Sequence, residues 1–298
     1  MAFLESLRKP QYVLRPRWAV RRILAKAGFS NGESASGAIE LPWGTKLYID
    51  EKDTVGRAIA AQGLYDVVTT EVLWRLIDDG ATVFDVGANI GYFTTLMAHR
   101  VGTTGSVLAF EPHPETLRLL QKNVAQIKHR NVRIENVALS DIEGEGALDN
   151  FVNEEGNTSY SFLTNDPSSR ALPVKMVRGE RYLKQKPSLM KVDAQWHEAS
   201  VLAGFGAALR DGSIRDIVFE EDAPYPAPSH KILLDAGYKL LWFDQRLSGP
   251  IVISPDERPK GIQPYEVLPS YLATRDEARA RDLLSKRGWQ SLKSRAAV

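Results

Sequence analysis

The sequence contains no cysteine, which excludes disulfides, thiolate zinc sites, iron–sulfur clusters and a cysteine nucleophile. It also has no apolar run near the roughly 18 residues that a membrane-spanning helix needs. Its first ten residues lack the apolar segment of a signal peptide. Net charge is almost absent, because 38 Lys and Arg residues balance 37 Asp and Glu residues, so no overall field attracts nucleic acid or an anionic membrane. We expect a cytoplasmic protein without a membrane span or a nucleic-acid partner.

The 298 residues are 43% hydrophobic and 25% charged, as in ordinary globular proteins, and a chain of this length can bury a sizeable core. Three regions differ in character. Residues 1–55 are expected to form an extension with a basic helix and a β-hairpin. Residues 56–256 are expected to form an α/β domain with an insertion at 141–187, and residues 257–298 a helical tail.

Positive charge is concentrated at the N-terminus, where residues 1–30 carry seven Lys and Arg residues against Glu5 alone. The stretch that begins at Trp18 is typical of a short basic amphipathic helix. Such a helix is either a solvated face of the protein or a docking element for an acidic partner or a membrane surface. Residues 39–49 then predict a hairpin that turns at Pro42-Trp43-Gly44.

Strands and helices alternate from residue 82 onward, after a helical pattern over about 56–77. Buried strands are predicted near 82–86, 106–110, 131–137, 189–193 and 214–220. Helices of 10–15 residues between such strands imply parallel crossovers and a sheet covered on both faces. Further helices are expected at 197–209 and 229–236. The insertion favours antiparallel edge strands, and residues 238–244 and 250–254 suit a closing hairpin.

The most informative segment is the run Phe84-Asp-Val-Gly-Ala-Asn-Ile-Gly-Tyr-Phe93. A strand leads into a glycine turn that opens a helix, so backbone N–H groups and the positive helix end converge where an anionic group binds. Gly87 allows a sharp turn and the close approach of a ligand. Gly91 is expected to let the helix pack against the strand.

An acidic residue follows at the tip of the next strand, in Phe110-Glu111-Pro112. A carboxylate at this position can accept hydrogen bonds from a ribose diol. Pro112 ends the strand and keeps Glu111 at the edge of the sheet. The segment therefore predicts a nucleoside site.

The spacing of the glycines narrows the choice of nucleoside. A dinucleotide fingerprint has a second glycine where this chain has Asn89, and no phosphate-binding loop of the G-x-x-x-x-G-K-[ST] type is present. The ligand that remains has adenosine, no phosphates and a carboxylate of its own, which describes S-adenosylmethionine. The alternative is a tight turn that binds nothing.

At these residues the chain resembles the FkbM family of S-adenosylmethionine-dependent methyltransferases, over about residues 60–245. The family pattern contains Y-E, D-x-G-A-N-x-G, F-E-P-x-P, an Asn and A-L-S-D. This chain matches it with Tyr65-Asp66, Asp85-Val-Gly87-Ala88-Asn89-Ile-Gly91, Phe110-Glu111-Pro112-His-Pro114, Asn123 and Ala138-Leu139-Ser140-Asp141. The resemblance implies a class I methyltransferase fold, an α/β three-layer sandwich whose seven-stranded sheet closes with an antiparallel hairpin.

The resemblance also implies roles for the matching residues. Ala138 and Leu139 would border the adenine, and Ser140 or Asp141 would reach its exocyclic amine. Tyr65 would close over the methionine end of the cofactor, and Asp85 would fix the turn or contact the cofactor's amino group. The cofactor-binding set is Tyr65, Asp85, Gly87, Ala88, Asn89, Gly91, Glu111, Pro112, Ala138, Leu139 and Asp193.

A later family motif, D-x-E-G-x-E, departs here to Asp193-Ala-Gln195-Trp196-His197-Glu198. Gln195 can form hydrogen bonds but cannot act as a base. Trp196 adds bulk beside the pocket, where it could cover an apolar substrate.

Methyl transfer depends mostly on alignment, and a hydroxyl acceptor also needs a group that takes its proton. His197 is the best-placed base in the sequence, although it is equally compatible with a surface histidine at a helix start. Asp193 would orient His197 or the acceptor, and Glu220, at the end of its strand, is a third candidate. Asp193 and His197 alone are weak grounds for a metal site, so no metal is expected.

The sequence thus predicts O-methylation of a small molecule, which the family resemblance narrows to a sugar or natural-product hydroxyl. The insertion 141–187 and the segment before residue 80 would form the acceptor pocket. Two alternatives stay open: N-methylation of a peptide or amine, and S-adenosylmethionine binding without catalysis. A homodimer also stays open.

Overall fold

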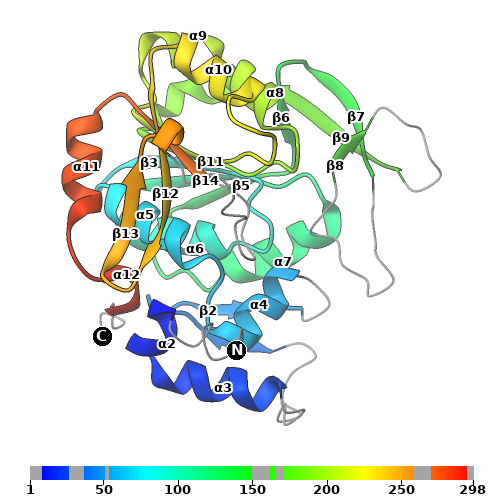
Figure 1. Ribbon diagram of the computed structural model, residues 1–298. Helices are drawn as coiled ribbons and strands as arrows, with labels where there is room; N and C mark the ends of the chain where they lie inside the picture. Colours follow the sequence, from blue (N-terminus) through cyan, green and yellow to red (C-terminus); the bar gives the residue numbers. More distant parts are fainter. Residues whose placement is uncertain are drawn as a thin grey trace.

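The computed structural model describes residues 9–26, 37–50, 54–149, 162–164, 171–257 and 270–293. Its centre is an eight-stranded sheet with the order β13-β12-β14-β11-β10-β3-β4-β5 (Figure 1). The strands in that order are β13 (Gly249–Ile253), β12 (Lys239–Arg246), β14 (Ser270–Thr274), β11 (Asp216–Glu220), β10 (Leu189–Val192), β3 (Thr82–Val86), β4 (Ser106–Phe110) and β5 (Val132–Glu135). The predicted α/β fold with a mostly parallel sheet is confirmed.

Two hydrophobic cores cover opposite faces of this sheet, because successive side chains of a strand point to opposite sides. Val83 of β3 belongs to one core, together with helices α5 (Val67–Leu76), α6 (Tyr92–Arg100) and α11 (Glu277–Ser285). Its neighbour Phe84 belongs to the other core, with α8 (Glu198–Ala203), α9 (Gly206–Asp211) and α10 (Pro228–Asp235). The helices therefore form the outer two layers of a three-layer sandwich.

The sheet closes differently from the expectation. Strands β12 and β13 form the predicted antiparallel hairpin. However, β14 lies between β11 and β12 and is antiparallel to both. The sheet therefore has eight strands instead of seven, and the segment 257–298 is not only a helical tail. The five residues of β14 are all buried, but the run is short and adjoins a helical pattern, so its strand character was not apparent in the sequence.

Part of the insertion joins β6, which directly precedes it, in a second, four-stranded sheet with the order β6-β9-β7-β8. Its strands are β6 (Ala138–Ser140), β9 (Ala171–Arg178), β7 (Gly144–Asp149) and β8 (Phe162–Thr164). The strand β7 pairs antiparallel with β8 and β9, as the insertion's composition predicted. Residues 150–161 and 165–170 of the insertion lie outside the described residues. A 3₁₀ helix, Gly179–Gln185, leads back to β10.

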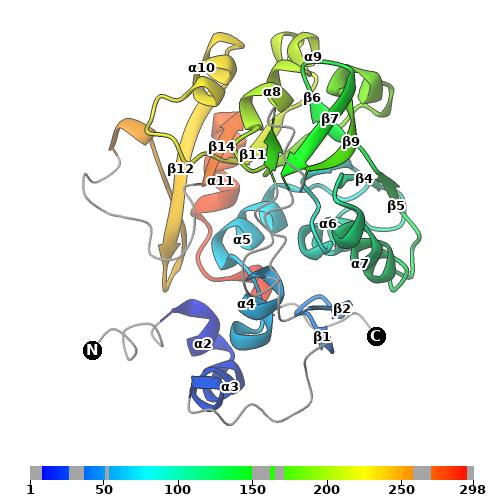
Figure 2. The ribbon, with the colours of Figure 1, turned by 90° about the vertical axis from the view of Figure 1, so that its right-hand side faces the viewer.

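The N-terminal extension consists of α2 (Pro10–Leu14), α3 (Pro16–Lys26) and the predicted hairpin of β1 (Ala38–Glu40) and β2 (Lys46–Tyr48). Figures 1 and 2 both show α2 and α3 side by side at one end of the molecule. The helical pattern at 56–77 is two helices, α4 (Thr54–Gln62) and α5. They are separated because Gly63 adopts φ +84° against the ring of Trp18, and because the Asp66 carboxylate caps α5.

The predicted helix at 197–209 is also two helices, α8 and α9. Gly204 lies between them, and its backbone contacts the carbonyl of Ser140 so closely that a Cβ would not fit. The remaining helices are α7 (Pro114–Val124), α12 (Gln290–Lys293) and the 3₁₀ turn Pro255–Glu257.

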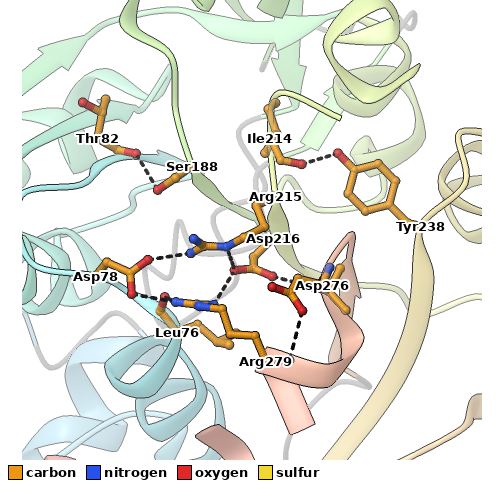
Figure 3. A network of polar contacts seen from close by, with 11 residues as sticks. Leu76, Asp78, Thr82, Ser188, Ile214, Arg215, Asp216, Tyr238, Asp276 and Arg279 are labelled. Carbon is orange, nitrogen blue, oxygen red and sulfur yellow. Dashed lines mark hydrogen bonds and ion pairs between the residues drawn. The ribbon is translucent and has the colours of Figure 1, made fainter. Parts of the chain in front are cut away.

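An ionic network around the buried Asp216 ties α11 to the amino-terminal end of β11 (Figure 3). Asp216 accepts hydrogen bonds from Arg215 Nε at 2.8 Å and from Arg279 Nη1 at 3.2 Å. The second nitrogens of both arginines reach Asp78, at 2.9 and 2.7 Å. Burial opposes ionisation of Asp78, but the hydrogen bonds from Arg279 and Arg215 outweigh it and lower its pKa. This network lies at the edge of the sheet away from the predicted site and has a structural role.

Candidate active site

Four chain segments meet at the carboxyl-terminal edge of the parallel strands. The register pairs Val86 with both Phe110 and Val192, and Val192 with Phe219. The next residues along the four strands therefore form one row: Glu111, Gly87, Asp193 and Glu220. Ligands of open α/β sheets bind at this edge. Tertiary pairing thus brings four of the predicted site residues together.

The glycine turn after β3 is held by the neighbouring strand. Gly87 N and Ala88 N donate to the carbonyl of Phe110, at 3.1 and 3.0 Å. Gly87 has φ +73°, and a Cβ there would overlap the carbonyl oxygen of Asp193. The close approach that requires this glycine is therefore made by the protein's own backbone, where the sequence suggested a ligand. Because Asp193 packs directly on the turn, the two segments cannot move independently.

Gly91 begins α6 with φ +91° and also differs from its expected role. A Cβ on Gly91 would lie 2.7 Å from Leu120 Cδ1, on α7. The glycine thus permits the contact between α6 and α7 in place of the predicted contact between helix and strand. Between the two glycines, Asn89 adopts φ +49°, a left-handed conformation that Asn tolerates better than most residues.

Glu111 connects the tip of β4 to the turn. Its Oε2 accepts the N–H of Asn89 at 2.8 Å, and its Oε1 accepts the N–H of His113 at 2.8 Å. Burial raises the pKa of Glu111 to about 7, against the lowering effect of these two hydrogen bonds. The half-buried Pro112 follows, and its carbonyl accepts a hydrogen bond from Asn136 Nδ2. Glu111 is therefore a candidate ribose ligand, and it also stabilises the turn at Asn89.

Asp85 is completely buried in β3. Its Oδ2 accepts a hydrogen bond from Thr94 Oγ1 at 2.5 Å, which links the strand to α6. Its Oδ1 lies 3.8 Å from Lys191 Nζ and has no hydrogen-bond partner among the described residues. Burial raises the pKa of Asp85, although Lys191 and Thr94 oppose this.

Lys191 is the functional candidate that the sequence analysis missed. It lies opposite Asp85 on β10, is 3% exposed, and its Nζ donates to Asp193 Oδ2 at 3.1 Å. Asp193, Asp85 and Glu220 raise the pKa of Lys191, although burial alone would lower it. The sequence could have identified Lys191, because it interrupts the apolar strand Leu189-Met-Lys-Val192. A buried charge is rare unless it is paired, so a lysine in such a strand indicates a partner of opposite charge.

Asp193 and His197 do not form the predicted pair. The Asp193 carboxylate accepts hydrogen bonds from Lys191 Nζ and, at 3.2 Å, from Gln195 Nε2. His197 Nε2 lies 3.1 Å from Ser140 Oγ, whose hydroxyl also reaches Asp141 at 3.1 Å. Burial lowers the pKa of His197, so its imidazole is neutral near pH 7. The His197 side chain therefore contacts the second sheet and does not contact Asp193.

The half-buried Glu220 and the buried Glu198 lie beside Asp193. Burial, followed by the charge of Asp193, raises the pKa of Glu220 well above its usual value, while Lys191 opposes the shift. Glu198 accepts the N–H of Ala194 at 2.8 Å, and burial raises its pKa to about 7. Glu198 therefore stabilises the 193–198 turn. Glu220, which ends β11, is a carboxyl group that holds a proton more tightly than an exposed glutamate does.

Trp196 lies at the rim of this edge. Gln195 and Trp196 both have positive φ, +47° and +66°, a conformation that is strained for a bulky residue. Trp196 is 62% exposed, and its Nε1 donates to Asp222 Oδ2 at 2.9 Å, after β11. The side chain therefore extends outward from the 193–198 turn, bridging the ends of β10 and β11.

Tyr65, Ala138 and Leu139 are the remaining predicted residues. The ring of Tyr65 makes edge contacts with those of Tyr92 and Phe93, at centroid distances of 6.1 and 6.3 Å, where α6 begins. Ala138 and Leu139 are buried in β6.

Across the described ranges, His, Asp and Glu side chains form no group of three that could bind a metal ion. In the same ranges, no helix has both the length and the apolar character needed to cross a bilayer.

The residues at the turn fit S-adenosylmethionine. The carboxyl groups of Asp85, Glu111, Asp193 and Glu220 outnumber the cation of Lys191, which suits a ligand with sulfonium and ammonium charges. Each oxygen of Glu111 accepts one backbone N–H, and a carboxylate oxygen can accept a second donor. Asp85 Oδ1 supplies a further buried acceptor.

Comparisons with known proteins agree with this geometry. A family model described as the methyltransferase FkbM domain matches residues 85–240, more than half of the chain. Hexuronic acid methyltransferase AglP of Haloferax volcanii is 24% identical over 214 residues, which cover 67% of this chain and 83% of that protein.

Two further similarities are partial. A protein-L-isoaspartate O-methyltransferase of Caenorhabditis elegans is 39% identical over 67 residues, so the chain spans only 29% of that relative's length. Among solved structures, methyltransferase FkbM from Methylobacillus flagellatus KT aligns with 65% of this chain and 43% of its own, with 12% identity and a TM-score of 0.43.

Proposed function

Because this chain belongs to the FkbM methyltransferase family, we propose that it transfers a methyl group from S-adenosylmethionine to a hydroxyl of a small molecule. We further propose that the acceptor is a sugar or a natural product. The similarity to a hexuronic acid methyltransferase supports a sugar. The observation that carries the proposal is the row of carboxyl groups beside the glycine turn, with Glu220 in the position of a base.

The cofactor supplies, when bound, a methyl group activated by the sulfonium. Glu111 and the turn at Asn89 would hold the nucleoside, and Asp85 Oδ1, which has no hydrogen-bond partner among the described residues, would accept a hydrogen bond from the cofactor. Lys191 keeps Asp193 in place through its hydrogen bond. Fixing the acceptor and the cofactor in line accounts for most of the expected acceleration.

Glu220 takes the proton of the acceptor hydroxyl in this scheme. Burial and the charge of Asp193 raise its pKa, and a carboxylate with a raised pKa is a stronger base. His197 is the second candidate, because its imidazole is neutral, but its Nε2 is engaged by Ser140. The position of Glu220 in the row with Asp193 and Gly87 favours Glu220.

The cofactor assignment is tested by calorimetric titration with S-adenosylhomocysteine, with NAD as the comparison ligand. We expect micromolar binding of S-adenosylhomocysteine and none of NAD. Glu111→Gln should weaken binding by about tenfold or more, since it removes a charge-assisted acceptor. Glu115→Gln, an exposed acid four residues on, is the matched control and should bind like the wild type. Equal binding by both variants would contradict the assignment of Glu111.

The base is tested by methyl transfer to a panel of hydroxylated and amine acceptors between about pH 5 and pH 9. Glu220→Gln should lose hydroxyl methylation by about a hundredfold or more, and His197→Asn should retain most of it. The reverse result would make His197 the base. Turnover of an amine that neither variant affects would favour N-methylation, which needs no strong base. Cofactor binding without transfer to any acceptor would favour a binding protein.

A further inference from the structure

An apolar surface is exposed on the two N-terminal helices. Val13 and Leu14 of α2 are 55% and 42% exposed, and Val20 and Ile23 of α3 are 55% and 43% exposed. Val20 and Ile23 are three residues apart, so they lie on one face of α3. The other side of α3 is anchored by the buried Trp18, which packs on Gly63. Half of the large hydrophobic side chains that are exposed in the described part of the chain thus lie on two adjacent short helices.

Two chain segments at the same end of the molecule carry basic residues and no acidic ones. Residues 9–26 contain six Lys and Arg residues and no acid, and residues 286–293 contain three and no acid. The two segments are in contact, because Arg15 donates from Nε and Nη2 to the carbonyl of Leu292, at 2.9 and 2.6 Å. Since the whole chain has a net charge of +1, the remainder is acidic. The charge is therefore strongly polarised toward this end.

We propose that this basic apolar face, made of Val13, Leu14, Val20 and Ile23 with the basic residues Lys9, Arg15, Arg17, Lys286, Arg287 and Lys293, binds the surface of an anionic lipid bilayer. A helix with aliphatic residues on one side and basic residues beside them lies in the membrane interface, with its apolar side chains among the acyl chains. Each basic residue near an anionic surface adds an attraction that salt screens. No membrane span is involved.

The chemistry favours lipid over an acidic protein. The exposed side chains are aliphatic and project from convex helices, whereas protein interfaces are enriched in aromatic anchors that fill pockets. In Figures 1 and 2, α2 and α3 form the outermost layer at their end, so a flat surface can reach them. Trp18 joins this face to the active site, because Gly63, on which it packs, is two residues before Tyr65. A bound bilayer would therefore lie beside the segment that flanks the cofactor turn.

The test is co-sedimentation of the full chain with vesicles of phosphatidylcholine and phosphatidylglycerol, compared with phosphatidylcholine alone. We expect binding to the anionic vesicles that falls steeply with salt. Val20→Ser/Ile23→Ser should weaken it by about tenfold or more, because two aliphatic side chains no longer enter the lipid. Ile142→Ser/Leu234→Ser is the matched control, since these side chains are 55% and 40% exposed elsewhere, and it should bind like the wild type.

A second variant, Arg17→Glu/Lys293→Glu, tests the charge, because both side chains are exposed and lie on the two contacting segments. It should abolish the preference for anionic vesicles. Binding of S-adenosylhomocysteine serves as the check that each variant is folded. Absence of vesicle binding at low salt, or equal binding to neutral vesicles, would overturn the proposal. So would a homodimer in analytical ultracentrifugation that Val20→Ser/Ile23→Ser dissociates, since the face would then be a contact between two copies.

Discussion

Replacing Lys191 with Met is the most direct test of the charge arrangement at the sheet edge. The ammonium lies 3.1 Å from Asp193 Oδ2 and 3.8 Å from Asp85 Oδ1. At an effective dielectric constant of about 20, each contact corresponds to about 4–5 kcal/mol of Coulomb attraction, which the desolvation of the buried groups largely offsets. The variant keeps the apolar stem but leaves two carboxyl groups without their cation. We expect a loss of about 3–5 kcal/mol in the free energy of unfolding at pH 7.

The loss should depend on pH in a defined direction. Burial already raises the pKa of Asp85, and removal of Lys191 raises it further. A carboxyl group with a raised pKa binds its proton more tightly in the folded state, so stability falls as pH rises from the pKa of the unfolded chain to that of the folded one. The difference between variant and wild type should therefore be small near pH 4 and largest at neutral pH.

Urea unfolding followed by circular dichroism at several pH values measures this difference. Lys184→Met is the control, because Lys184 is exposed on the 3₁₀ helix before β10 and its replacement should change stability by less than about 0.5 kcal/mol. A loss at Lys191 below about 1 kcal/mol at pH 7 would refute the reasoning. A loss that is the same at pH 4 and pH 7 would show that packing, not charge, determines it.

Three further predictions concern the turn and the scaffold. Gly87→Ala should destabilise the protein by several kcal/mol in thermal unfolding, because a Cβ there overlaps the carbonyl of Asp193 and φ is +73°. Gly206→Ala is the control and should be close to neutral, since its Cβ would meet only the flexible end of Arg210. As pH rises from about 4.5 to about 7, the stability of the wild type should fall more steeply than that of Glu111→Gln. The reason is that the pKa of Glu111 is raised to about 7, so the folded state keeps its proton to higher pH than the unfolded chain does. Equal dependence of stability on pH in the two proteins would contradict this. Arg279→Met should lower the free energy of unfolding by about 1–3 kcal/mol, because it breaks the contacts to Asp216 and Asp78. Arg281→Met removes only a surface ion pair with Glu277, so in the same urea titration it should lower the free energy of unfolding by less than about 0.5 kcal/mol.

The local sequence alone determined the elements with strong signals. The run Phe84–Phe93 carries its own strand, turn and helix start, because glycine and Asn are needed where φ is positive. The pattern Phe110-Glu111-Pro112 likewise marks a strand tip whatever surrounds it. Alternation of buried strands and helices predicted the parallel sheet, since both signals depend on residues close together in the chain.

Contacts between distant segments decided the rest. The strand β14 is identified by its neighbours β11 and β12, not by its five residues, and it changed the closure of the sheet. Gly87 is required by the backbone of Asp193, which lies 106 positions later in the chain. The partners of Lys191, Asp193 and His197 depend on register and on the second sheet, so spacing along the sequence could not identify them. Side-chain chemistry is local, but the partner that gives it a function is chosen by tertiary packing.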